Sequence, residues 1–330
     1  MNRTGGDWDP ADRHVYFCAG NTSNARLAFD SGSRHILVAV NDLKSDAAIA
    51  ECEALIDRGA HVLVDSGVFW LTNEHKRAHN MTMDAALALA PEEIDGFDWL
   101  WGQYIRIVKR LGDKAWGYIE LDQGGMVNKR KTRSKLHDLG LNPIPVYHPL
   151  NDGWDYFDEL AEGYGRLCWG NVVQANAVTR KHFLQTCWER HRAYPDLWVH
   201  LLGLTPNQWL LSYPCDSADS SSWLTHVRWA KAHREDSMLR KFSGLDVNYR
   251  FIHSATLAAM AGMDEEDVDE TVDEDEAKAG TPDAYRSMAM SVIGSVAMNR
   301  CWRHWQNRVQ EELGLPLYPP PSEELRRAVA

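Results

Sequence analysis

Short apolar runs alternate with amphipathic segments from residue 14 to about residue 216. The apolar residues within each run are nearly continuous, which is typical of strands that are covered on both faces of a parallel sheet. Most runs end in Gly or Asp or are directly followed by Gly, Asp, Asn or His. Eight runs are predicted as strands: 14–19, 35–40, 61–65, 115–121, 143–147, 166–170, 197–203 and 210–214.

The segments between these runs predict helices. Ser45 is a suitable N-cap for a helix over 46–58, and Thr179 for one over 180–193. Further helices are expected at 84–90, 97–111, 152–162 and, with Thr205 as cap and Pro206 in the first position, 206–211. The alternation of strand and helix predicts an α/β fold, a (β/α)8 TIM barrel over 14–222. An open doubly wound sheet is the alternative, because periodicity does not reveal closure.

The strand pattern stops near Trp223, and the rest of the chain predicts helices. We expect a single domain over 1–330, made of the barrel core and a helical C-terminal elaboration over 223–330. Residues 264–276 are densely acidic and are expected to form a solvated loop.

Composition limits the possible partners and compartments. The 47 acidic and 35 basic residues give a net charge of −12, so binding to a polyanion would need a local basic patch. The six cysteines are widely spaced without a C-x-x-C pair, which favours reduced thiols. No apolar stretch reaches the roughly 18 residues of a membrane span, and no apolar signal follows the polar start. We expect a cytoplasmic protein without membrane contact.

Aspartates follow three of the predicted strands, and each has Gly or Ser residues close to it in the sequence. Asp65 precedes Ser-Gly, Asp122 precedes Gln-Gly-Gly, and Asp216 and Asp219 lie in a Ser-rich segment. In a parallel barrel the carboxyl ends of strands carry the reactive groups. Carboxylates that converge there are what glycosyl transfer requires. The alternative interpretation is that each aspartate caps the helix after it.

Four segments resemble those of tRNA-guanine transglycosylases, in family order. Residues 64–69 (VDSGVF) resemble D-S-G-G-[FY]-Q, residues 121–123 (LDQ) resemble L-D-E, residues 200–206 (HLLGLTP) are similar to Y-L-M-G-V-G-T-P, and residues 216–220 (DSADS) match D-x-x-D-C. The family's C-x-C-x-x-C…H zinc site is absent from the sequence, and Ser-Ser-Trp stands in place of P-T-R. Because it lacks the zinc site and has Ser-Ser-Trp at this position, the chain resembles the phage-encoded branch of the family that inserts 7-deazaguanines into DNA.

The resemblance implies a role for each matching residue. Asp219 would be the nucleophile at C1′ of the sugar, Asp65 the general acid and base, and Asp122 the group that reads the amino-pyrimidinone edge of the base. The remaining implied base contacts are Phe69 and Leu202 as a sandwich around the ring, Gly170 through its backbone, His148 at a strand end, and Ser66, Gly67, Gly203 and Asp216 within the matching segments. The implied partners are DNA and a free 7-deazaguanine base, such as 7-cyano-7-deazaguanine. No metal and no cofactor is expected.

Basic residues follow the Asp122 segment and are candidates for phosphate contacts: Lys129, Arg130, Lys131, Arg133 and Lys135. The alternative is the solvated start of a helix. A second basic cluster follows Asp219: Arg228, Lys231, His233, Arg234, Arg240 and Lys241. Trp70 and Trp223, beside the two catalytic candidates, could stack on DNA bases when the target base is extruded, or belong to the core.

Two weaker patterns complete the sequence. His75 and His79 have the i, i+4 spacing of a metal half-site, but no third ligand is near in the sequence. A Met and Trp stripe over 288–305 is typical of core or of a homodimer contact. Three other functions remain open: a transglycosylase that acts on tRNA, a catalytically silent barrel subunit that binds nucleic acid, and a barrel glycosidase for small sugars.

Overall fold

The computed structural model describes residues 15–30, 33–204 and 215–221. This part of the chain has a mixed α/β fold with eight parallel strands in one sheet, in the order β4-β3-β2-β1-β8-β7-β6-β5. The strands are β1 (Val15–Ala19), β2 (His35–Ala39), β3 (His61–Asp65), β4 (Gly117–Tyr118), β5 (Val146–Tyr147), β6 (Arg166–Trp169), β7 (Trp198–Leu201) and β8 (Ser217–Ser220).

The first and last strands of this order are also connected to each other. Ile119, just after β4, forms a parallel bridge with Ile144, just before β5. The Ile144 amide donates to Tyr118 O at 2.8 Å, and the Glu120 amide donates to Ile144 O at 3.0 Å. The residues that adjoin β4 and β5, the two ends of the strand order, are therefore bonded to each other.

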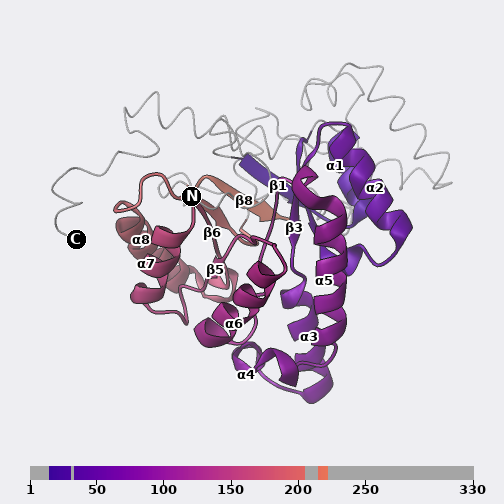
Figure 1. Cartoon of the computed structure of the whole chain (residues 1–330). Coiled ribbons are helices and arrows are strands. Elements are labelled where there is room, and N and C mark those ends of the chain that lie inside the picture. Colours follow the sequence, from indigo (N-terminus) through magenta and orange to yellow (C-terminus); the bar gives the residue numbers. More distant parts are fainter. Residues whose placement is uncertain (1–14, 31–32, 205–214, 222–330) are drawn as a thin grey trace, which may run out of the picture.

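Within the described ranges, eight α-helices connect or flank the strands (Figure 1). In that view α1, α2 and α5 lie on one side of the strands, α7 and α8 on the other, and α3 and α4 at the bottom. Their bounds are α1 (Thr22–Asp30), α2 (Asp46–Asp57), α3 (Val68–His79), α4 (Met83–Ala88), α5 (Phe97–Leu111), α6 (Gly125–Asp138), α7 (Trp154–Gly163) and α8 (Ala177–His191). None of the helices in this part of the chain is both long and apolar enough to cross a membrane.

The predicted helices are confirmed where the structure describes them, with small shifts. Ser45 caps α2 as predicted, because its side chain accepts from the Ala48 amide. The predicted cap of α8 is wrong: Asn176 caps this helix by accepting from the Thr179 amide at 3.0 Å, so the helix begins three residues earlier. α1, α3 and α6 were not predicted.

Alternate residues of the strands pack in two separate apolar clusters. In β3, Val62 and Val64 face the helices, whereas Leu63 belongs to a second cluster. That second cluster joins residues from distant strands: Phe17, Leu37, Leu63, Trp116, Ile119, Ile144, Val146, Cys168 and Trp198. Both faces of the sheet are therefore covered, as the continuous apolar runs predicted.

The eighth strand of the sheet is not the predicted one. It is β8, whose four residues are buried although three of them are polar. The predicted strand 210–214, the helix 206–211, Trp223, the second basic cluster and the whole of 223–330 lie outside the described residues.

Candidate functional site

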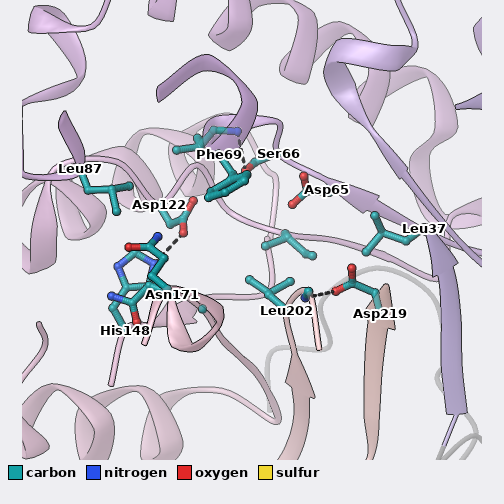
Figure 2. A pocket seen from close by; sticks show the side chains of 15 residues that line it. Leu37, Asp65, Ser66, Phe69, Leu87, Asp122, His148, Asn171, Leu202 and Asp219 are labelled. Carbon is teal, nitrogen blue, oxygen red and sulfur yellow. Dashed lines mark hydrogen bonds and ion pairs between the residues drawn. The ribbon is translucent and has the colours of Figure 1, made fainter. Parts of the chain in front are cut away.

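A cavity of about 190 Å³ lies where several strands reach their carboxyl ends. It is smaller than the pockets of roughly 300–1,000 Å³ that hold drug-sized ligands, so it suits one small ring system. Nine residues named from the sequence line it: Asp65, Ser66, Phe69, Asp122, His148, Gly170, Leu202, Gly203 and Asp219. Figure 2 shows Asp122 and His148 on one side of the cavity and Asp65 and Asp219 on the other.

Asp65 is the last residue of β3, and its carboxylate accepts from the Gly67 amide at 3.2 Å. Burial raises the pKa of Asp65 to about 7, and the charges of Asp219 and Asp122 add to this shift. A carboxyl group with this pKa can both give and take a proton near neutral pH.

The turn after Asp65 requires a glycine. Gly67 has a left-handed φ of 78°, and a Cβ at this position would lie 2.8 Å from Asn41 Oδ1. Gly67 does not itself line the cavity; it begins α3. The first turn of that helix carries Phe69, whose ring is 54% exposed although it lines the cavity. A large apolar ring at a cavity rim suits contact with a flat ligand.

Asp219 is held by two donors on one of its oxygens. Oδ1 accepts from the Gly203 amide at 2.9 Å and lies 3.1 Å from His200 Nε2. The other ring nitrogen of His200 bonds the Ser217 hydroxyl. Because Oδ1 is fixed by these neighbours, the carboxylate has a defined orientation at the cavity wall. His200 lies in a segment that the sequence singled out, but its contact with Asp219 was not predicted.

Asp122 and His148 form a pair on the opposite wall. His148 Nε2 lies 2.8 Å from Asp122 Oδ2. Burial alone would raise the pKa of Asp122, but the hydrogen bond from His148 and the charges of His148 and Lys129 outweigh it, so the pKa lies below its ordinary value. Gly170 makes this pairing possible, because a Cβ there would lie 2.9 Å from the His148 ring.

The basic tract forms part of α6, and two of its members are structural. Lys129 is fully buried; its Nζ bonds Asp152 Oδ2 at 2.5 Å and donates to Val146 O at 3.0 Å. Arg133 is buried as well and bonds Glu120 through Nε at 2.6 Å. The prediction that these two contact phosphate is wrong, because both charges are neutralised inside the protein.

The other three members of the tract lie at the surface. Arg130 is exposed and pairs with Glu159. Lys131 and Lys135 are exposed. Only these three stay candidates for phosphate contacts within the tract.

The buried pairs also support the site. Asp152 Oδ2 accepts from the His148 amide at 2.8 Å, and Glu120 Oε1 accepts from the Val146 amide at 2.7 Å. The α6 cations therefore fix β5 and the residue after it, and so position the His148 ring against Asp122.

Gln123, next to Asp122, joins the site to α3 and α4. Its Oε1 accepts from the Thr72 hydroxyl at 2.9 Å, and its Nε2 donates to Ala86 O and Leu89 O, each at 2.9 Å. Between those two carbonyls lies Leu87, which lines the cavity. Gln123 thus holds the segment that forms this wall, a role the sequence did not reveal because its partners lie 34 to 51 positions away.

Asp216 does not line the cavity. It is fully buried, and its Oδ2 accepts from the Val199 amide at 2.7 Å. This bond ties the start of β8 to β7. The prediction that Asp216 contacts the base is therefore corrected to a structural role.

His75 and His79 have a third neighbour that is distant in sequence. Asp95 Oδ2 lies 3.2 Å from His75 Nδ1 and 2.6 Å from His79 Nε2. The three groups are close enough to hold a metal ion together. However, His75 Nδ1 already accepts from the Asp95 amide at 3.1 Å, which uses the lone pair that an ion would need. These contacts join the end of α3 to the segment before α5.

The structure adds cavity residues that the sequence did not indicate, among them Leu87, Asn171 and Gln174. No motif marks them, because a polar or apolar side chain in a connecting segment is common and only its spatial neighbours are unusual. No protein-family model matches the chain, and no curated protein matches it.

Proposed function

We propose that this protein exchanges guanine in DNA for a 7-deazaguanine base through a covalent glycosyl-aspartate intermediate. The observation that carries the proposal is the convergence of Asp65, Asp122 and Asp219, which are far apart in sequence, on one cavity of base-sized dimensions. The contrast between the raised pKa of Asp65 and the lowered pKa of Asp122 supports different roles for two carboxyl groups in one site.

The proposal includes a closed (β/α)8 barrel. Support comes from the parallel bridge between Ile119 and Ile144, which links the two ends of the strand order. The second apolar cluster, which joins residues of seven strand segments, has the composition of a barrel interior. In such a barrel the carboxyl ends of all strands surround one site, which fits the origin of the cavity residues.

The chemistry requires two displacements at C1′ of the nucleotide. The free oxygen of Asp219 attacks C1′ and forms a C–O bond while the bond from C1′ to the base nitrogen breaks; Asp65 gives its proton to that nitrogen. The incoming base then loses the proton of the corresponding nitrogen to Asp65 and attacks C1′, which releases the Asp219 carboxylate. Each atom and charge is restored, and the two inversions retain the anomeric configuration.

Recognition of the base is assigned to the other wall. Asp122, charged and held by His148, is suited to accept from the ring N–H and exocyclic amine of guanine. Phe69 and Leu202, both at the cavity wall, are suited to pack on the two faces of a flat ring.

Contact with nucleic acid is supported by an aromatic cluster that begins beside Phe69. The rings of Trp70 and Trp99 are 6.2 Å apart, and Lys44 Nζ lies 5.5 Å from the Trp70 ring. Trp99 is 41% exposed, whereas Trp70 is partly buried against the core. An exposed indole ring beside a second indole and a cation suits stacking on unpaired bases. The buried thiols Cys52, Cys168 and Cys187 form no disulfide, which is typical of a reducing compartment, and we propose the cytoplasm.

Trp99→Ala is expected to weaken binding of a guanine-containing DNA oligonucleotide by about fivefold or more, because one stacking surface is lost. Binding of free guanine should not change, since Trp99 does not line the cavity. Trp154→Ala is the matched control: Trp154 is 37% exposed and lies on α7. Fluorescence anisotropy measures both variants, and equal losses in the two would contradict a specific role of Trp99.

The function is tested by nucleoside mass spectrometry. Duplex DNA, single-stranded DNA and a tRNA are each incubated with the protein and with isotope-labelled guanine or a 7-deazaguanine. The proposal expects labelled base in DNA. Label in tRNA alone would favour the tRNA-directed alternative, and binding without label in any substrate would favour a catalytically silent subunit.

A further inference from the structure

Asn171 has a backbone conformation that few residues other than glycine adopt. Its φ is 53°, and among the described residues Asn80, with φ 52°, is the only other residue besides glycines with a positive φ. Asn80 has an evident reason, because it ends α3 and its amide donates to Lys76 O. Asn171 begins the 3-10 helix at Val172–Gln174, yet its side chain makes no capping bond there. Its conformation therefore serves another purpose.

The side chain of Asn171 lies at the cavity wall beside the Asp122 and His148 pair (Figure 2). The residue is 8% exposed. Its Nδ2 donates to Asn151 Oδ1, which fixes the amide plane. Its Oδ1 is buried and has no hydrogen-bond partner. A buried acceptor without a partner is unfavourable, so such a group is expected to find its partner in a ligand.

We propose that Asn171 is a specificity-determining residue whose Oδ1 accepts a hydrogen bond from an N–H of the bound base. The inference rests on the proposed function and names a feature of its substrate. The described cavity residues include three aspartates and no lysine or arginine, so a ligand rich in N–H donors is favoured. The donor is either the exocyclic amine of the pyrimidine ring or an amine on a substituent at the 7 position. Both have the same chemistry.

Two ligand pairs distinguish these sources. Guanine and hypoxanthine differ in the exocyclic amine, and 7-aminomethyl-7-deazaguanine and 7-cyano-7-deazaguanine differ in the substituent donor. Isothermal titration measures the affinity of each base for the full-length protein. In at least one pair, Asn171→Gly is expected to lower the affinity for the donor-bearing base by about three- to tenfold, because one acceptor is lost. The affinity for the other base of that pair should not change. Glycine keeps the left-handed backbone without strain.

Two further variants separate the acceptor from other effects. Asn171→Asp tolerates the same φ and keeps an oxygen acceptor, so it should preserve the preference that the glycine variant loses. Asn80→Gly makes the same substitution at an exposed position with nearly the same φ and should change no affinity. Three results would overturn the inference. Asn171→Gly could weaken the binding of both bases of each pair equally, it could change the binding in neither pair, or Asn171→Asp could lose the preference for the donor-bearing base.

The outcome is separable from that of the proposed function. If the unaltered protein exchanges guanine but Asn171→Gly keeps the same preference for the donor-bearing bases, only the role proposed for Asn171 is wrong. If the unaltered protein binds none of the four bases and exchanges none, the proposed function fails first.

Discussion

Asp219→Asn is expected to abolish base exchange, by roughly four to six orders of magnitude, because an amide cannot form the glycosyl ester. The fold should persist, since the amide oxygen of asparagine still accepts from the Gly203 amide. The direct readout is the intermediate: with the unaltered protein, a DNA oligonucleotide should give a covalent adduct on a denaturing gel and in intact mass spectra. The variant should give none, and its affinity for free guanine should stay within about twofold.

The matched control is Asp216→Asn, three positions earlier on the same segment. Asp216 bonds the Val199 amide and does not line the cavity. In this variant the amide oxygen of asparagine still accepts from the Val199 amide, so it is expected to fold and to form the adduct. Two results would show that the nucleophile is assigned to the wrong aspartate. One is a covalent adduct in Asp219→Asn; the other is a folded Asp216→Asn variant that forms no adduct while Asp219→Asn does.

The parts of the fold that could be predicted are those in which apolar residues determine the element. The strand β3 and the helix α5 bury continuous or periodic apolar positions, and both were found at their observed limits. Because Asp65 ends β3, its place at a carboxyl edge followed directly from the pattern. The same holds for Gly170, which ends the predicted strand 166–170 and directly follows β6.

Two of the missed elements, β8 and α6, have polar side chains at buried positions. In β8, Ser217 bonds His200, and Asp219 bonds both His200 and the Gly203 amide. In α6, Lys129 and Arg133 occupy inward positions and are neutralised by Asp152 and Glu120. Hydrophobic periodicity cannot detect such positions, because the partners that make burial favourable are 13 to 23 residues away.

The same limit applied to the candidate site. The resemblance identified the three aspartates, but it could not show which oxygen of Asp219 is held, or that Asp95 approaches the two histidines of α3. The run of basic residues after Asp122 led to the prediction of five phosphate contacts in α6, of which Lys129 and Arg133 are excluded by burial. A charged residue in a sequence indicates solvent contact only when no side chain of opposite charge pairs with it inside the fold.

Asp65→Asn is expected to slow exchange by roughly 10²- to 10⁴-fold, the usual contribution of a positioned acid or base. In the proposed mechanism the protonated form of Asp65 gives its proton to the departing base, so single-turnover departure should slow as the pH rises through about 7. The variant has no proton to give and should lose this pH dependence. Rapid-quench measurements between pH 5 and 9 test both statements.

The same substitution should stabilise the protein at alkaline pH, which substitution of an aspartate whose charge is stabilised by the fold would not do. The pKa of Asp65 rises from 3.8 to about 7 on folding, so folding takes up a proton between these values. Stability is therefore present at low pH and is lost as the pH rises toward 7, by up to about 4 kcal/mol. Asparagine stays neutral and avoids this loss. Denaturation at pH 8.5 should therefore show a higher free energy of unfolding for the variant than for the unaltered protein, and this difference should disappear near pH 4. Asp122→Asn is the control with the opposite sign, because the lowered pKa of Asp122 means that its charge stabilises the fold at neutral pH. If both variants destabilise at pH 8.5, Asp65 is not the buried acid that the exchange mechanism needs.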